Sequence, residues 1–246
     1  MKIVLFKISL LIFISFSLSL KAAEKLTLVT EHWPPFNFLN AEGKVDGIAT
    51  NTIKQIVSEA GFDYDIELLA WRRAYNKAKN NKNVLLYTIY KLDNRTEDFQ
   101  WICPLIQTPG VKVYALSERD DIKISKLEDL RHYVIGIINT GWTFEYFKIN
   151  GFKPGEHLDL GKSESANIKK LLLGRVDLVV QEEELVGVRL VNQGKKHNAV
   201  KEVFTLLTEA HKEGCIATSK STPENVVARL RAALLKVNQM NKSQQN

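Results

Sequence analysis

The chain has 246 residues, a formal net charge of +6 and a composition typical of globular proteins, with 45% hydrophobic and 25% charged residues. Without residues 1–22 three lysines are lost and the charge falls to +3, so the basic balance does not argue for nucleic-acid or membrane partners. The lysines and arginines are also scattered among acids rather than clustered.

The first segment of the chain has the pattern of a secretion signal. Lys2 and Lys7 precede an apolar and hydroxylic run of 13 residues, 8–20. This length fits the roughly 7–15 residues of a signal core and is short of the roughly 20 that span a bilayer. Ala22 offers a cleavage position, which predicts a periplasmic protein that begins at Ala23. An uncleaved anchor is the alternative, because Lys21 lies beside the cut. No cysteine follows the run, which argues against a lipoprotein.

Strand and helix patterns alternate in the remaining 224 residues. The alternation predicts an α/β protein with a mostly parallel sheet, as one large domain or two lobes. In such sheets ligands bind beyond the carboxyl ends of the strands. The expected strands are 26–30, 64–68, 84–89, 111–116, 134–138 and 176–180, and the expected helices are 53–60, 70–79, 143–149, 165–173, 182–191 and the segment that follows Pro223.

Aromatic and charged residues follow several of these strands. Trp33 and Trp71 are placed to sandwich a small ligand, although core packing is the alternative for any tryptophan. Trp142 lies in a turn and is expected to face a cleft. The guanidinium of Arg95 can grip a carboxylate with two parallel hydrogen bonds, and the alternative is a surface arginine paired with Asp93 or Asp98.

Two further groups at strand ends are candidate ligand contacts. Glu182 begins a helix, where it can accept bonds from an ammonium group or simply interact with the helix dipole. Free backbone N–H groups in the loop from Asn139 to Thr143 can bind an anion. The loop has one glycine and no Gly-Lys-Ser/Thr, so it is not a phosphate loop.

Catalytic and metal-binding patterns are absent from the sequence. There is no Gly-x-Ser-x-Gly elbow, and none of the five histidines has metal-type spacing. Cys103 and Cys215 lack such spacing too, and the sequence leaves open whether they form a disulfide or stay free. We therefore expect no enzyme activity, no metal and no cofactor.

Taken together, these segments resemble the bacterial extracellular solute-binding proteins that serve polar amino acid ABC importers, which are periplasmic binding proteins of type II. The resemblance spans the mature chain and depends on the order and spacing of several segments. They are 28–38, 43–61, 88–104, 126–130, 136–143 and 174–182.

The resemblance implies a two-lobed clamshell. Lobe one takes residues 23–114 and 214–246, lobe two takes 115–213, and 111–116 and 215–218 are the crossover strands. It also implies that Arg95 holds the ligand's carboxylate, that Trp33 and Trp71 pack on its body, and that Glu182 takes its amino group. Tyr90, Asn139, Trp142 and Thr143 complete the expected site.

Some positions depart from the family pattern and bear on the ligand's identity. Tyr90 and Trp142 stand where small residues are common, and Glu182 replaces an aspartate. The leading hypothesis is a monomer that binds an amino acid or related carboxylate for an inner-membrane ABC permease. The alternatives are an enzyme on the same scaffold, such as a cyclic-acid dehydratase with Glu182 or His32 as general acid, and a sensor or accessory module without an importer.

Overall fold

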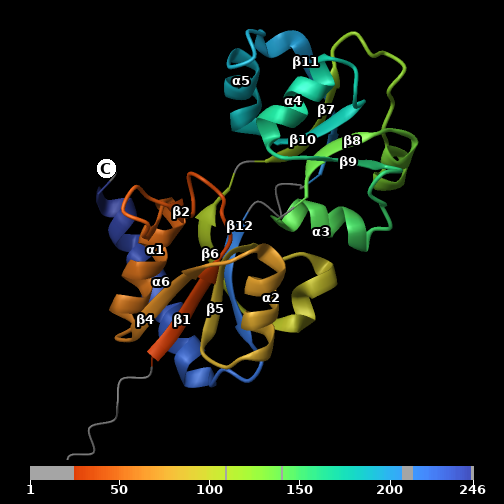
Figure 1. The fold of residues 1–246 in the computed structure, drawn as a ribbon. Coiled ribbons are helices and arrows are strands. Elements are labelled where there is room, and N and C mark those ends of the chain that lie inside the picture. The colour runs from red at the N-terminus through yellow and green to blue at the C-terminus, as the bar shows by residue number, and fades with distance from the viewer. Residues whose placement is uncertain (1–24, 109, 140, 207–212, 245–246) are drawn as a thin grey trace, which may run out of the picture.

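The computed structural model describes residues 25–108, 110–139, 141–206 and 213–244. They form two lobes, each built on a five-stranded sheet (Figure 1). The predicted secretion signal, Thr140 and His211 lie outside the described residues. Within the described part of the chain, no helix is both long and apolar enough to cross a bilayer.

Lobe one has the strand order β4-β1-β5-β12-β6. The central strand β5 is buried at every residue, and its Val-Leu-Leu-Tyr-Thr-Ile-Tyr sequence suits a strand covered on both faces. Helix α1 turns Ile53, Ile56 and Val57 inward. The strands are β1 (Lys25–Thr30), β4 (Asp63–Leu68), β5 (Val84–Tyr90), β6 (Phe99–Gln107) and β12 (Glu213–Ser219), with the small pair β2 (Phe38–Leu39) and β3 (Val45–Asp46); the helices are α1 (Ile48–Glu59), α2 (Trp71–Asn80), α6 (Glu224–Gln244) and the 3-10 helix η1 (Asp93–Asp98).

Lobe two has the strand order β11-β7-β10-β8-β9. Helix α3 lies on the side of this lobe that faces α2 of lobe one (Figure 1). The strands are β7 (Val111–Leu116), β8 (Ile135–Ile138), β9 (Leu158–Gly161), β10 (Leu178–Glu182) and β11 (Val200–Thr205); the helices are α3 (Gly141–Ile149), α4 (Glu164–Leu172), α5 (Glu183–Val191) and the 3-10 helices η2 (Leu127–His132) and η3 (His197–Ala199).

The two-lobed α/β class expected from the sequence is confirmed. Each sheet has a parallel part, β4-β1-β5 and β10-β8-β9, and an antiparallel part next to the passages between the lobes. Strand β7 pairs with β10 and β11, so its residues from Val111 onward belong to the second sheet. The chain therefore passes between the lobes near β7 and again between β11 and β12. The lobe boundaries at 114 and 214 stay a prediction.

Cys103 and Cys215 are bonded to each other, which resolves the alternative that the sequence left open. The bond joins the neighbouring strands β6 and β12 inside lobe one. Strand β6 was not expected from the sequence, because Pro104 interrupts its pattern. Strands β9 and β11 were also missed.

Candidate functional site

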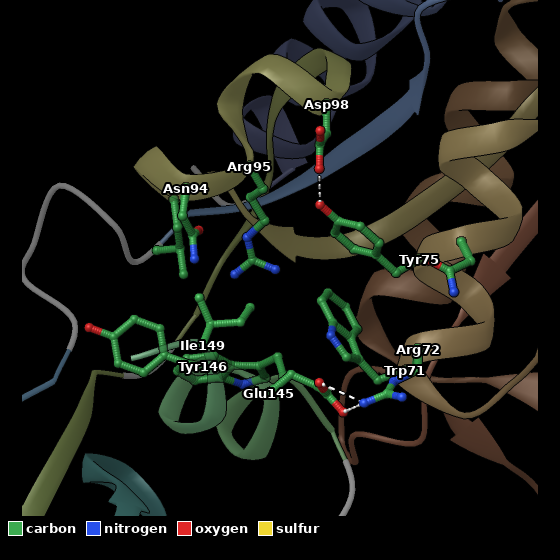
Figure 2. Close-up of a pocket in the computed structure, with 12 residues that line it drawn as sticks. Trp71, Arg72, Tyr75, Asn94, Arg95, Asp98, Glu145, Tyr146 and Ile149 are labelled. Carbon is green, nitrogen blue, oxygen red and sulfur yellow. Dashed lines mark hydrogen bonds and ion pairs between the residues drawn. The ribbon is translucent and has the colours of Figure 1, made fainter. Parts of the chain in front are cut away.

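A cavity of about 360 Å³ lies between the lobes. Lobe one contributes its walls from α2 and the η1 segment, and lobe two contributes one face of α3 (Figure 2). This volume lies within the roughly 300–1,000 Å³ of small-molecule sites. The lining residues are Trp71, Arg72, Tyr75, Asn76, Leu92, Asn94, Arg95, Asp98, Trp142, Glu145, Tyr146 and Ile149.

Arg95 is the buried cation of this cavity. It lies on η1, just after β5, and only 9% of its surface is exposed. Its guanidinium points into the cavity (Figure 2) and stacks on Trp71, with 5.4 Å from Cζ to the ring centroid. The buried Nε has no hydrogen-bond partner. Burial lowers the pKa of Arg95 to about 10, against the opposing effects of Tyr75, Glu31 and Tyr90.

Asp98 does not neutralise Arg95, although the sequence offered it as a partner. Its carboxylate accepts hydrogen bonds from the Tyr75 hydroxyl at 2.5 Å and from Lys79 at 2.7 Å. These bonds from α2 draw Asp98 away from Arg95, as Figure 2 shows for the bond to Tyr75. Arg95 therefore presents its charge to the cavity rather than to a surface carboxylate.

Helix α3 supplies the opposite wall with one side, on which Trp142, Glu145, Tyr146 and Ile149 recur at helical spacing. Glu145 accepts two hydrogen bonds from Arg72 of α2, at 3.0 and 3.2 Å. This ion pair connects the lobes at the edge of the cavity, where the Arg72 side chain is 64% exposed.

Trp33 and Tyr90 are not among the residues that line the cavity. The ring of Tyr90 contacts Trp33 at 5.7 Å and Trp142 at 5.0 Å between centroids. Both residues are buried. A continuous row of rings thus runs from the aromatic turn of lobe one to the start of α3.

Glu182 is placed away from the cavity lining, at the end of β10. Its carboxylate accepts a hydrogen bond from Trp33 Nε1 at 3.2 Å and pairs with Arg189 at 2.7 Å. The same Arg189 donates to Gln181 Oε1. The carboxylate is therefore already shared between an indole of lobe one and an arginine of lobe two.

Of the eight residues expected from the sequence, the structure brings Trp71, Arg95 and Trp142 together on the lining. Thr143 is half-buried on α3 outside the lining, and Asn139 is exposed after β8.

Tyr75 and Tyr146 were missed by the sequence reasoning. Each follows a named tryptophan by one helical turn, so the spacing i to i+4 on α2 and α3 would have found them.

Glu31 was also missed as a candidate, although it directly follows β1. Its side chain is buried, and its Oε2 lies 3.1 Å from the position that a Cβ would take at Gly141, the first residue of α3. Desolvation raises its pKa to about 8, while the backbone N–H of Trp142 and the charge of Arg95 act in the opposite direction.

No cluster of three or more His, Cys, Asp or Glu side chains that could hold a metal ion occurs among the described residues. The cavity instead combines a buried cation, aromatic walls and polar groups such as Asn76 and Asn94. This set suits a small organic solute with an anionic group.

The fold and the cavity define a two-lobed binding protein whose site lies between the lobes. Residues 26–244 match the family model of the bacterial extracellular solute-binding proteins, family 3. The chain belongs to this family, as its sequence pattern suggested. Comparison with curated proteins gives no match.

Solved structures share the fold over most of their length. A histidine kinase sensor domain with similarity to periplasmic binding proteins is 19% identical, with a TM-score of 0.67, and the alignment covers 91% of this chain and 94% of that one. An ancestral arginine-binding protein bound to arginine is 22% identical, with a TM-score of 0.62 and coverages of 90% and 95%. The arginine-, lysine-, histidine-binding protein ArtJ from Geobacillus stearothermophilus is 18% identical, with a TM-score of 0.61 and coverages of 89% and 91%. At these identities the likeness establishes the fold alone.

Proposed function

We propose that this chain is a periplasmic solute-binding protein that captures a small carboxylate-bearing solute, an amino acid or a close relative, between its lobes. The observation that carries the proposal is Arg95, a residue that is nine-tenths buried and not paired with Asp98 and whose guanidinium faces the cavity. A buried charge is costly unless it is paired, and a solute carboxylate supplies the missing partner.

The rest of the cavity fits the body of such a solute. Trp71 and Trp142 offer ring faces from opposite lobes, and Tyr146 extends the wall on α3. We assign the solute's amino group to Asp98 or Glu145, because these acids line the cavity and Glu182 does not. Each of the two already accepts hydrogen bonds, Asp98 from Tyr75 and Lys79 and Glu145 from Arg72, so the amino group would share the carboxylate with them. Two of the similar structures are of an ancestral arginine-binding protein, bound to arginine in one and to glutamine in the other, which supports the amino acid class.

We further propose that the protein is exported by its cleaved signal, acts as a monomer and delivers the solute to an inner-membrane ABC permease without catalysis. The general acids considered for an enzyme are poorly placed for that role. Glu182 is committed to an ion pair, and His32 is exposed on the aromatic turn. A sensor module without an importer is the second candidate, because a kinase sensor domain shares the fold with a TM-score of 0.67.

A thermal-shift panel of the natural amino acids and small mono- and dicarboxylates tests the proposal. One carboxylate-bearing ligand should raise Tm, and Arg95→Met should abolish that rise. Arg73→Met is the matched control, because Arg73 is an exposed arginine of α2 outside the cavity lining. A ligand that stabilises the Arg95 variant as strongly as the wild type would exclude Arg95 as the anchor.

Uptake separates the importer from the sensor. A deletion strain that loses uptake of the labelled ligand, and regains it with the wild-type gene, supports the importer. Unchanged uptake with altered transcription in response to the ligand favours the sensor. Conversion of the ligand by the purified protein would instead establish an enzyme.

A further inference from the structure

A side-chain hydrogen bond crosses from one lobe to the other beside the row of aromatic rings. The indole Nε1 of Trp33, in the turn after β1 of lobe one, donates to Oε1 of Glu182 at the end of β10 of lobe two, at 3.2 Å. Trp33 is buried, and the side chain of Glu182 is only 16% exposed. Because this bond is largely shielded from water, it is stronger than the same bond at the surface.

Lobe one fixes the donor in place. The backbone N–H groups of Phe36 and Asn37 both donate to the Trp33 carbonyl at 2.9 Å, and the Trp33 N–H donates to the Asn37 carbonyl at 2.7 Å. The indole packs against the rings of Phe36 and Tyr90, at centroid distances of 5.0 and 5.7 Å. The turn and these rings therefore orient the indole N–H without any solute.

Lobe two fixes the acceptor. Arg189 of α5 donates to Oε2 of Glu182 at 2.7 Å and to Oε1 of Gln181 at 2.5 Å. Gln181 donates in turn to Glu164 of α4 at 2.6 Å. These bonds hold one carboxylate oxygen of Glu182 and leave the other for the indole. Since each lobe orders its own group, formation of the interlobe bond costs little conformational entropy.

We propose that Trp33 and Glu182 are positioning residues whose hydrogen bond holds the lobes in the closed arrangement before any solute enters. The family resemblance implied instead that both contact the solute, yet neither lines the cavity. They act through the walls, because closure places α3 against α2. A larger closed fraction raises the apparent affinity for a solute in proportion. The proposal rests on the proposed function only for the purpose of closure, since the bond itself involves no solute.

Distance measurements between spin labels test the proposal without any solute. Asn80 and Lys148 are exposed residues of α2 and α3, the helices that face each other across the lobes (Figure 1). Cysteines introduced there take labels selectively, because the native cysteines are bonded to each other. The mature wild type should show mainly the short distance. Trp33→Phe keeps an aromatic ring and removes the donor, so it should lower the ratio of short-distance to long-distance populations at least about tenfold.

Trp101→Phe is the matched control for this substitution. The indole of Trp101 also donates a hydrogen bond, at 2.8 Å, but its acceptor is the carbonyl of Thr96 within lobe one. This variant should keep the wild-type ratio.

A second variant removes the same bond from the side of lobe two. Glu182→Leu deletes the acceptor and leaves the indole and its ring contacts in place. It should lower the ratio about as much as Trp33→Phe, and the double variant should lower it no further, because both substitutions remove one bond. Glu164→Leu is the control, since Glu164 accepts its bond from Gln181 within lobe two.

A wild type that is mainly open without solute, or single variants that keep its ratio, overturns the proposal. So does an equal fall in the controls, or an additive fall in the double variant, because each residue would then act through its own packing. If Trp33→Phe does not fold, the comparison of Glu182→Leu with Glu164→Leu decides. Since no solute is present, failure here leaves the solute-binding proposal to be judged by its own thermal-shift panel.

Discussion

Replacement of Arg95 by methionine should stabilise the ligand-free protein while it abolishes solute binding. Burial lowers the pKa of Arg95 from 12.5 to about 10, which corresponds to a cost of about 3 kcal/mol for the charged form in the folded state. At neutral pH the arginine is charged in both the folded and the unfolded state, so this full cost is present. Methionine keeps a long apolar side chain at this position and removes the buried charge, and with it this cost.

The loss of the stacking on Trp71 offsets part of this gain. A cation over an indole at 5.4 Å contributes about 0.5–2 kcal/mol, so we expect a net gain of about 1–2 kcal/mol. For a chain of this size each kcal/mol raises Tm by about 2–4 °C, which predicts a rise of about 4 °C.

Thermal unfolding of the wild type, Arg95→Met and Arg73→Met without ligand measures the effect. The exposed Arg73 variant should stay close to the wild type. A lower Tm for Arg95→Met would refute the reasoning, because it would mean that the folded protein already satisfies the guanidinium and leaves no charge for a solute.

Three other predictions concern contacts around the site and the core. Between about pH 4.5 and 8 the wild type should lose as much as about 5 kcal/mol of unfolding free energy relative to Glu31→Gln, because the raised pKa of Glu31 favours the protonated folded state; a difference in unfolding free energy between the two proteins that stays constant across this range would contradict this. Replacing both cysteines of the Cys103–Cys215 disulfide by alanine should cost about 2–4 kcal/mol, and an unchanged urea midpoint would argue against it. Gly141→Ala should lower Tm more than Gly155→Ala. Both glycines have a positive φ, but only the methyl group added at position 141 would meet another side chain, that of Glu31. An equal fall in Tm for the two variants would mean that backbone strain alone causes it.

The helices and strands with a strong hydrophobic pattern could be predicted from the sequence. The buried run of β5 and the apolar stripe of α1 are both visible in it. Strand β6 was not predicted, because Pro104 and the half-exposed residues of this strand break the alternation of apolar and polar positions. Strand β9 has only four residues, which is too short for periodicity to show.

The roles of individual charges were harder to predict, because pairing depends on residues from other elements. Arg95 could be named from its place after a strand, but whether Asp98 neutralises it depends on Tyr75 and Lys79 of α2. Glu182 likewise lies at the end of a strand, but its carboxylate is paired with Arg189, which lies two helical turns further along the chain in α5. Sequence patterns place a side chain at an edge of the sheet and do not show its partner.

The contacts between the lobes differ in what they can contribute to closure. The pair between Arg72 and Glu145 lies at the edge, where exposed ion pairs are worth about 0–1 kcal/mol and are screened by salt. The Glu31 carboxyl is buried beside Gly141 of α3, and its ionisation is penalised by desolvation. Since Glu31 and Arg95 influence each other electrostatically, a solute carboxylate bound to Arg95 would further disfavour an ionised Glu31.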